Sequence, residues 1–204
     1  MSIPAPVPVP YGDDTTWSHP LDIAMLAAHV AQCRAEAPNS HEKGKRLEQL
    51  LCWLLAHVPG FRVLKVNKFS ADHSQEIDIS LWNEQLPRDG FPQFGSTILT
   101  ECKNWTRRVD SSDVAWFDWK MRLAGVNEGI LVAASGVTGT SGRRHAAQAI
   151  LSAANSQQRR ILVLTLDEIA GLTSRHDLRE LLIGRMMDLA AGDALPEQPA
   201  TEEP

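Results

Sequence analysis

Two stretches of the sequence alternate apolar and polar residues and carry three charged side chains, Asp78, Glu101 and Lys103. Residues two apart on a strand share a face, so Glu101 lies beside Lys103, and Ile77 and Ile79 leave Asp78 on the opposite, polar face of its strand. If the two strands pair, two carboxylates and an ammonium converge. Carboxylate oxygens are hard ligands, so the pattern predicts a Mg²⁺ or Mn²⁺ site. Lys103 would orient or help deprotonate a water there, or stabilise charge on a phosphate.

An acid followed two residues later by a lysine is a short pattern, and the sequence contains a second instance at Asp118 and Lys120. That stretch has helical periodicity, and residues two apart on a helix do not face each other, so we reject it as a site. The instance at Glu101 and Lys103 is kept because it lies on a predicted strand and follows a second acid borne by a strand.

Length and composition indicate one globular domain: the chain has 204 residues and is 43% hydrophobic. The net charge of −5 includes four acids in the C-terminal tail, and without them it is −1, so clustered bases can still follow a phosphate backbone. Three cysteines without CxxC spacing indicate neither a disulfide framework nor a structural zinc site. With no membrane span and no signal-peptide pattern, we expect a cytoplasmic protein.

The chain divides into an extended Pro-rich arm (1–20), a single domain (21–190, with its core at 43–170) and a disordered acidic tail (191–204). A Pro- and Gly-rich insertion, 83–95, predicts a long exposed loop of the kind that often carries substrate contacts. Periodicity predicts strands at 61–68, 75–82, 97–105, 128–134 and 160–166 and helices at 21–37, 43–57, 110–123, 143–154 and 177–190. The strand–helix–strand order near the end implies a right-handed parallel crossover.

Further polar residues are candidates for the site or for a nucleic acid. Glu48, on the predicted helix 43–57, is either a solvated glutamate or a third acid beside the metal. Bases across the domain either contact phosphates or are solvated surface residues: Lys43, Lys45, Arg46, Lys68, Arg107, Arg108, Arg143 and Arg144. For Ser112, Asp113 and Lys120, a position near the metal competes with helix capping, which explains the first two equally well. His145 is expected at the surface.

Three tryptophans follow the second acid in sequence: Trp105, Trp116 and Trp119. An aromatic ring near this charge cluster could stack on nucleic-acid bases. Tryptophan is usually largely buried, so for these residues we favour core packing.

The order of these elements and residues resembles the PD-(D/E)xK nuclease superfamily, and more narrowly its Mrr-type restriction endonuclease branch. The resemblance covers roughly residues 43–170. It is carried by the acid of each strand and by three short motifs: Lys43-Gly44 at a helix start, Pro59-Gly60-Phe61 before the first strand, and Val137-Thr138-Gly139 after a later strand.

The resemblance implies an α/β, restriction-endonuclease-like fold with a central mixed sheet flanked by helices, and Mg²⁺-dependent cleavage of DNA. Asp78, Glu101 and Lys103 would be the catalytic trio, with Glu48 beside them as a fourth catalytic residue. The metal ligands would be Asp78, Glu101 and the backbone carbonyl of Cys102, whose side chain would point into the core.

Several readings of function stay open at this stage. The chain is either an endonuclease that acts in defence against foreign DNA, or the effector of a larger system with an activating partner protein. A structure-specific junction nuclease is a further alternative, and a catalytically dormant module for binding or assembly is another. Cleavage of both DNA strands would favour a homodimer that presents two sites.

Overall fold

The computed structural model of the chain describes Trp17 and residues 19–69, 76–138 and 141–196. Five strands form one sheet in the order β1-β2-β3-β4-β5. Strands β1, β2 and β3 pair antiparallel, whereas β3, β4 and β5 pair parallel, so the predicted α/β class with a central mixed sheet is confirmed. The strands are β1 Phe61–Phe69, β2 Glu76–Asn83, β3 Thr97–Lys103, β4 Glu128–Ala133 and β5 Arg160–Thr165.

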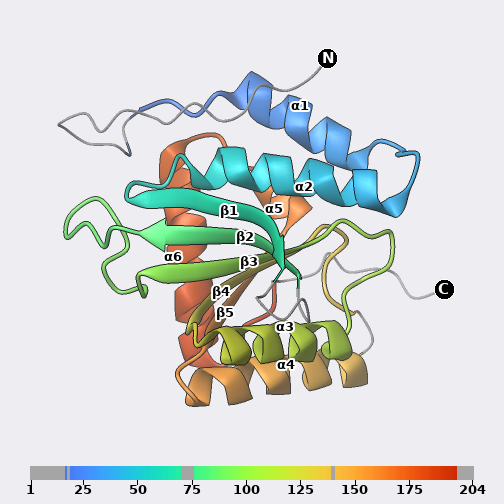
Figure 1. Cartoon of the computed structure of the whole chain (residues 1–204), viewed down its shortest axis with the longest axis vertical. Helices are drawn as coiled ribbons and strands as arrows, with labels where there is room; N and C mark the ends of the chain where they lie inside the picture. The colour runs from blue at the N-terminus through green and yellow to red at the C-terminus, as the bar shows by residue number, and fades with distance from the viewer. Residues whose placement is uncertain (1–16, 18, 70–75, 139–140, 197–204) are drawn as a thin grey trace.

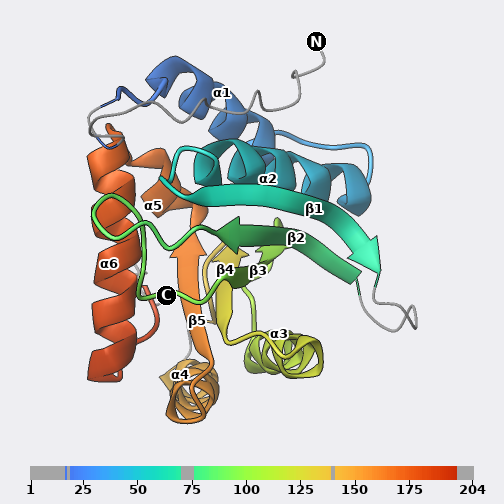
Figure 2. The same ribbon diagram turned by 60° about the vertical axis from the view of Figure 1, so that its left-hand side comes forward.

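Six helices in the described residues pack around this sheet. Figure 1 shows α1 and α2 stacked on one side of the sheet, with α3 and α4 lying side by side on the other. From the angle of Figure 2, α6 runs alongside β5, and the two are in contact. The helices are α1 Ile23–Arg34, α2 Ser40–Leu55, α3 Ser111–Ala124, α4 Ser141–Ser156, α5 Leu166–Ala170 and α6 Arg175–Ala191. None of them is long and apolar enough to cross a membrane.

The local sequence explains where helix α3 begins and ends. Asp110 accepts hydrogen bonds from the backbone N–H groups of Ser112 and Asp113, and the Asp113 side chain bonds back to the backbone of Asp110, which completes a capping box. Gly125 ends the helix in the left-handed region, with φ 64°, where glycine has no steric penalty. The predicted bounds of this helix are therefore accurate. The short helix α5 was not predicted because its leucine and isoleucine extend the apolar run of β5.

The loop between β2 and β3 corrects the prediction of a long exposed segment at 83–95. Phe91 and Phe94 are buried and pack on each other and on Phe61. The buried Asn83 side chain donates hydrogen bonds to the carbonyls of Phe91, Phe94 and Gly95. The aromatic residues fold the loop inward because their burial outweighs the turn-forming character of the prolines and glycines around them.

Both ends of the chain were predicted to lack structure. Of the predicted arm, residues 1–16 and 18 lie outside the described residues, but the indole N–H of Trp17 donates to the carbonyl of Asp89. The first part of the predicted disordered tail is ordered: Ala194 and Leu195 are buried, and the Ala194 N–H donates to Gln148. Residues 197–204 of that tail lie outside the described residues.

Close approach between α3 and β4 depends on Gly129. A Cβ at this position would lie 2.5 Å from Met121 Sδ and 2.9 Å from the Phe117 ring, and both residues belong to α3. Such distances are too short for non-bonded atoms, so a larger residue would push α3 away from the sheet.

We therefore expect Gly129→Ala to lower the free energy of unfolding by about 1–3 kcal/mol, measured by urea denaturation. Gly184→Ala in α6 is the control, because no atom lies within 4 Å of the added methyl. There alanine should be neutral or raise stability by about 0.5–1 kcal/mol through its higher helix propensity. Equal effects of the two substitutions would contradict this account of the α3 contact.

Candidate active site

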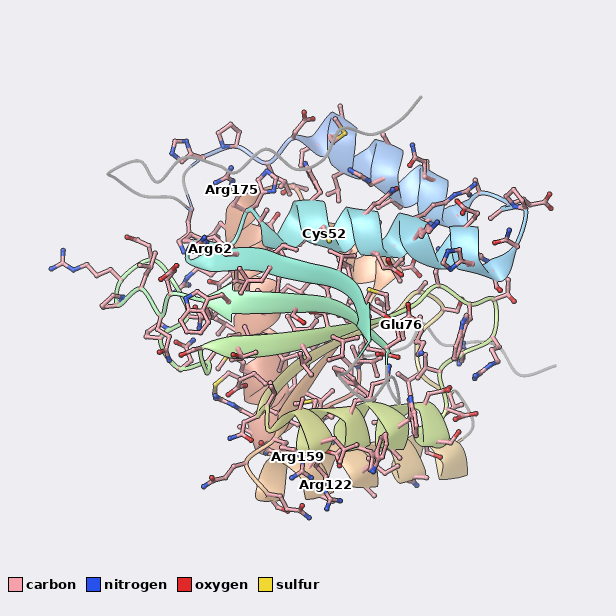
Figure 3. The ribbon with its side chains drawn as sticks, in the orientation of Figure 1. Cys52, Arg62, Glu76, Arg122, Arg159 and Arg175 are labelled. Carbon is pink, nitrogen blue, oxygen red and sulfur yellow. The ribbon has the colours of Figure 1, made fainter. Side chains whose placement is uncertain are left out.

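The register of β2 and β3 brings Asp78 and Glu101 together. Ile79 pairs with Thr100 at the end of the ladder, and Asp78 and Glu101 are the next residues on their strands, so their side chains project from the same face. Asp78 is near the start of β2 and Glu101 near the end of β3, and the strands are antiparallel, so both lie at one end of the sheet. Figure 3 labels Glu76, the first residue of β2, at this end, between α2 and α3. The loop between β2 and β3 lies at the other end.

Two ammonium groups hold the carboxylate of Glu101. Lys103 Nζ lies 2.6 Å from Glu101 Oε1, as residues two apart on a strand allow. Lys120 Nζ lies 2.7 Å from Oε2 and also donates to the backbone carbonyl of Glu76 at 2.7 Å. Glu101 is only 2% exposed, and its two ion pairs compensate for the hydration free energy that the carboxylate loses on burial.

Lys120 was recognised in the sequence only as a weak candidate. The prediction that Asp118 and Lys120 lie on a helix is confirmed, because both belong to α3. Lys120 nevertheless reaches the charge cluster, since it sits on the flank of the buried stripe formed by Phe117 and Met121. A lysine on the flank of the apolar helical stripe is the signal in the sequence that could have identified this role.

Asp78 occupies a different electrostatic position. Its Oδ2 accepts a hydrogen bond of 2.6 Å from the backbone N–H of Cys102. Burial, followed by the negative charge of Glu101, raises the pKa of Asp78 from its ordinary 3.8 to about 7. Burial lowers the pKa of Lys103, but its ion pair and hydrogen bond with Glu101 outweigh burial and raise it overall. Lys103 is therefore an ammonium at neutral pH, suited to orient or stabilise rather than to accept a proton.

The segment after β3 forms hydrogen bonds with α1, with α2 and with the residues that follow β4. The buried side chain of Asn104 donates to the carbonyls of Cys33 in α1 and Lys43 in α2. Trp105 lies under two cations, with the Arg107 guanidinium 3.9 Å and Lys103 Nζ 4.8 Å from its ring centre. Ser135, just past β4, donates to the carbonyl of Trp105. These contacts fix the end of β3 where the charged side chains converge.

The family model of the Mrr catalytic domain, described as a restriction endonuclease, matches residues 40–172. This stretch is well over half of the chain and contains all five strands and the charge cluster. The chain belongs to the Mrr-type restriction endonuclease family. Comparisons with curated proteins and with solved structures gave no significant match.

Membership makes the protein a nuclease of the restriction endonuclease type, a hydrolase that cleaves DNA. The resemblance stated from the order of its acids and lysine is confirmed. Restriction endonucleases of this kind generally use divalent metal ions.

The donor set of this nuclease domain fits a hard divalent cation. Among the described residues, no three His, Cys, Asp or Glu side chains are grouped to hold a metal, so the site offers two carboxylates and a carbonyl. Lys103 C=O accepts from Ala134 N–H in the direction of β4, so the Cys102 carbonyl, next along the strand, faces β2 and Asp78. Burial and then the Glu101 carboxylate raise the pKa of Asp78, and a bound divalent cation would favour its charged form. Water and phosphate oxygens would complete the coordination.

Glu48 lies on α2, across the sheet from Lys120 on α3. Its charge raises the pKa of the Cys52 and Cys102 thiols, in each case after the larger effect of burial. The Cys102 side chain is buried, as predicted. Glu48 is therefore close to the back of β3, and a part in the nuclease site remains a prediction.

Several predicted phosphate-binding bases have structural partners. Lys45 pairs with Glu42, and Arg107 pairs with Asp113 as well as lying over Trp105. Arg46 donates to three carbonyls at the end of α1. Lys43 and Arg108 are half-buried. The side chains of Lys68, Arg143 and Arg144 lie outside the described residues. DNA contact by any of these bases remains a prediction.

Trp116 and Trp119 correct the expectation of core packing. They are 46% and 37% exposed and stack on each other, with ring centres 4.6 Å apart. The buried stripe of α3 is formed by Val114, Phe117 and Met121, and residues 116 and 119 point away from it at 100° per residue. Trp105, by contrast, is partly buried against the core.

The remaining candidates have local explanations. Ser112 and Asp113 take part in the cap of α3, as helix capping predicted, and Asp113 is held by Arg107. His145 is exposed, as expected for a surface histidine.

The charge cluster generates a stability prediction for the metal-free nuclease. Because the folded pKa of Asp78, about 7, exceeds its ordinary 3.8, its ionisation opposes folding at neutral pH. Asp78→Asn in EDTA should therefore be more stable than wild type in urea. The advantage should be fully present above pH 7 and shrink as the pH falls from 7 towards 4, where wild-type Asp78 is protonated in the folded state. A pH-independent difference, or a less stable variant, would contradict it.

Proposed function

We propose that this restriction endonuclease hydrolyses DNA phosphodiester bonds with Mg²⁺ or Mn²⁺ held by Asp78, Glu101 and the backbone carbonyl of Cys102. One observation carries the proposal: two carboxylates on adjacent strands meet at one end of the sheet, with the Lys103 ammonium directly on the second of them. This arrangement lies inside the segment that matches the family.

The side chains divide the work of cleavage. A divalent cation would polarise the phosphate and lower the pKa of a coordinated water. Lys103, which stays protonated, donates a hydrogen bond to the attacking water or to a phosphate oxygen as negative charge develops there. Water adds to phosphorus in line with the departing oxygen, and the products are a phosphate monoester and a free hydroxyl. Glu48 supports this site from the α2 side.

Family membership also supports the wider role that we propose, defence against foreign DNA. The domain acts either alone or as the effector of a larger assembly that an activating partner switches on. Cleavage of both strands would use a homodimer with two sites.

The test incubates the purified chain with supercoiled plasmid in Mg²⁺, Mn²⁺ or EDTA. We expect nicking or linearisation that EDTA abolishes, and a loss of about 100-fold or more in rate for Lys103→Ala, because a charge-stabilising donor is gone. Arg62→Ala is the matched control: it removes one positive charge from β1, where Arg62 pairs with Glu84 away from the site, and should cut like wild type.

Cleavage by Lys103→Ala at the wild-type rate would contradict the proposed role of this lysine. If wild type neither cuts DNA nor binds Mn²⁺, the dormant module is favoured instead. Mn²⁺ binding without cleavage of plasmid would indicate that a partner or a special DNA structure, such as a junction, is required.

A further inference from the structure

Lys120 is a second lysine on the site carboxylate, supplied by helix α3 and independent of the strand motif that carries Lys103. Its ammonium has two anchors, Glu101 Oε2 and the Glu76 carbonyl, each at 2.7 Å. The side chain is 7% exposed, whereas that of Lys103 is 17% exposed. Burying a lysine that deeply is costly, and here every described anchor belongs to the two strands that carry the carboxylates.

The two lysines hold different oxygens of Glu101 and differ in what else they contact. Lys103 holds Oε1 and lies beside the partly buried Trp105 ring. Lys120 holds Oε2 and is tied to the backbone of β2. Lys103 is thus the lysine that can leave its oxygen, and Lys120 the one that stays.

The charges of the cluster also favour the withdrawal of one lysine when a cation binds. Asp78 and Glu101, when ionised, carry two negative charges, and Lys103 and Lys120 carry two positive charges, so the cluster is balanced without a metal ion. A divalent cation beside Glu101 would add two positive charges next to two ammonium groups, and this repulsion favours withdrawal of one lysine from the carboxylate. A withdrawn Lys103 ammonium is then available to the DNA phosphate.

We propose that Lys120 is a positioning residue of the nuclease site, which holds Glu101 by Oε2 so that Oε1 can pass from Lys103 to the divalent cation. This inference rests on the proposed function and adds a residue to it. Lys120 acts through Glu101 and does not itself contact the DNA.

The test is Mn²⁺ affinity measured by calorimetry on the full chain without DNA. Loss of one positive charge from the site would by itself strengthen cation binding. Loss of the group that orients a metal ligand typically weakens binding about 10–100-fold. We therefore expect Lys120→Met to bind Mn²⁺ about 10–100-fold more weakly than wild type, and Lys103→Met to bind it as tightly or more tightly.

Arg159→Met is the matched control. Arg159 forms a partly buried ion pair with Asp118, which lies on α3 as Lys120 does. Figure 3 labels Arg159 beside α3 and α4, away from Glu76. The substitution changes the net charge by the same amount and should leave Mn²⁺ affinity unchanged. Lys120→Arg keeps a cation that can donate to both oxygens, and it should bind Mn²⁺ more tightly than Lys120→Met.

Circular dichroism establishes which variants are folded, and if Lys120→Met is unfolded the comparison is made with Lys120→Arg and Lys120→Gln. Of these two, Gln should bind Mn²⁺ more weakly than Arg. Wild-type affinity or tighter binding in Lys120→Met, or in Lys120→Gln where Met is unfolded, would overturn the inference. Absence of Mn²⁺ binding by wild type would overturn the proposed metal site itself, a separate outcome.

Discussion

The buried carboxylate of Glu101, held between the ammonium groups of Lys103 and Lys120, is the interaction on which the rest of the site depends. It joins strand β3 to helix α3, and through Lys120 it also reaches the first residue of β2. Three elements distant in sequence are therefore fixed at one end of the sheet by a single set of charges. Glycine at position 129 allows the helix that supplies Lys120 to lie close against the sheet.

The same arrangement explains how a cluster of like charges is tolerated inside a folded domain. Asp78 carries the remaining electrostatic conflict, which appears as a pKa near 7. With both carboxylates ionised, such a site is balanced by its two lysines in the metal-free protein, and withdrawal of a lysine would relieve repulsion when a cation binds. The electrostatic conflict is confined to the residues that we propose for DNA cleavage, and the surrounding core is conventionally apolar.

Much of the fold was predictable because its signals are local. Period-two alternation located the strands that bear Asp78 and Glu101, and the pairing of those strands followed from the resemblance. Contacts over long sequence distances were not predictable. Lys120 on α3 contacts Glu76 in β2 and Glu101 in β3, far from it in sequence, and the buried Phe91 and Phe94 pack on the distant Phe61. Trp116 and Trp119 show that residue type alone is a poor guide to burial when helical phase contradicts it.

The most direct test of the central claim is a crystal structure of the chain grown with Mn²⁺, with anomalous diffraction recorded at the manganese edge. The account predicts one strong anomalous peak within coordination distance of Asp78, Glu101 and the Cys102 carbonyl, with Lys103 moved off Glu101 Oε1 and Lys120 still on Oε2. Manganese bound elsewhere, or no peak at this end of the sheet although Mn²⁺ supports cleavage, would contradict it.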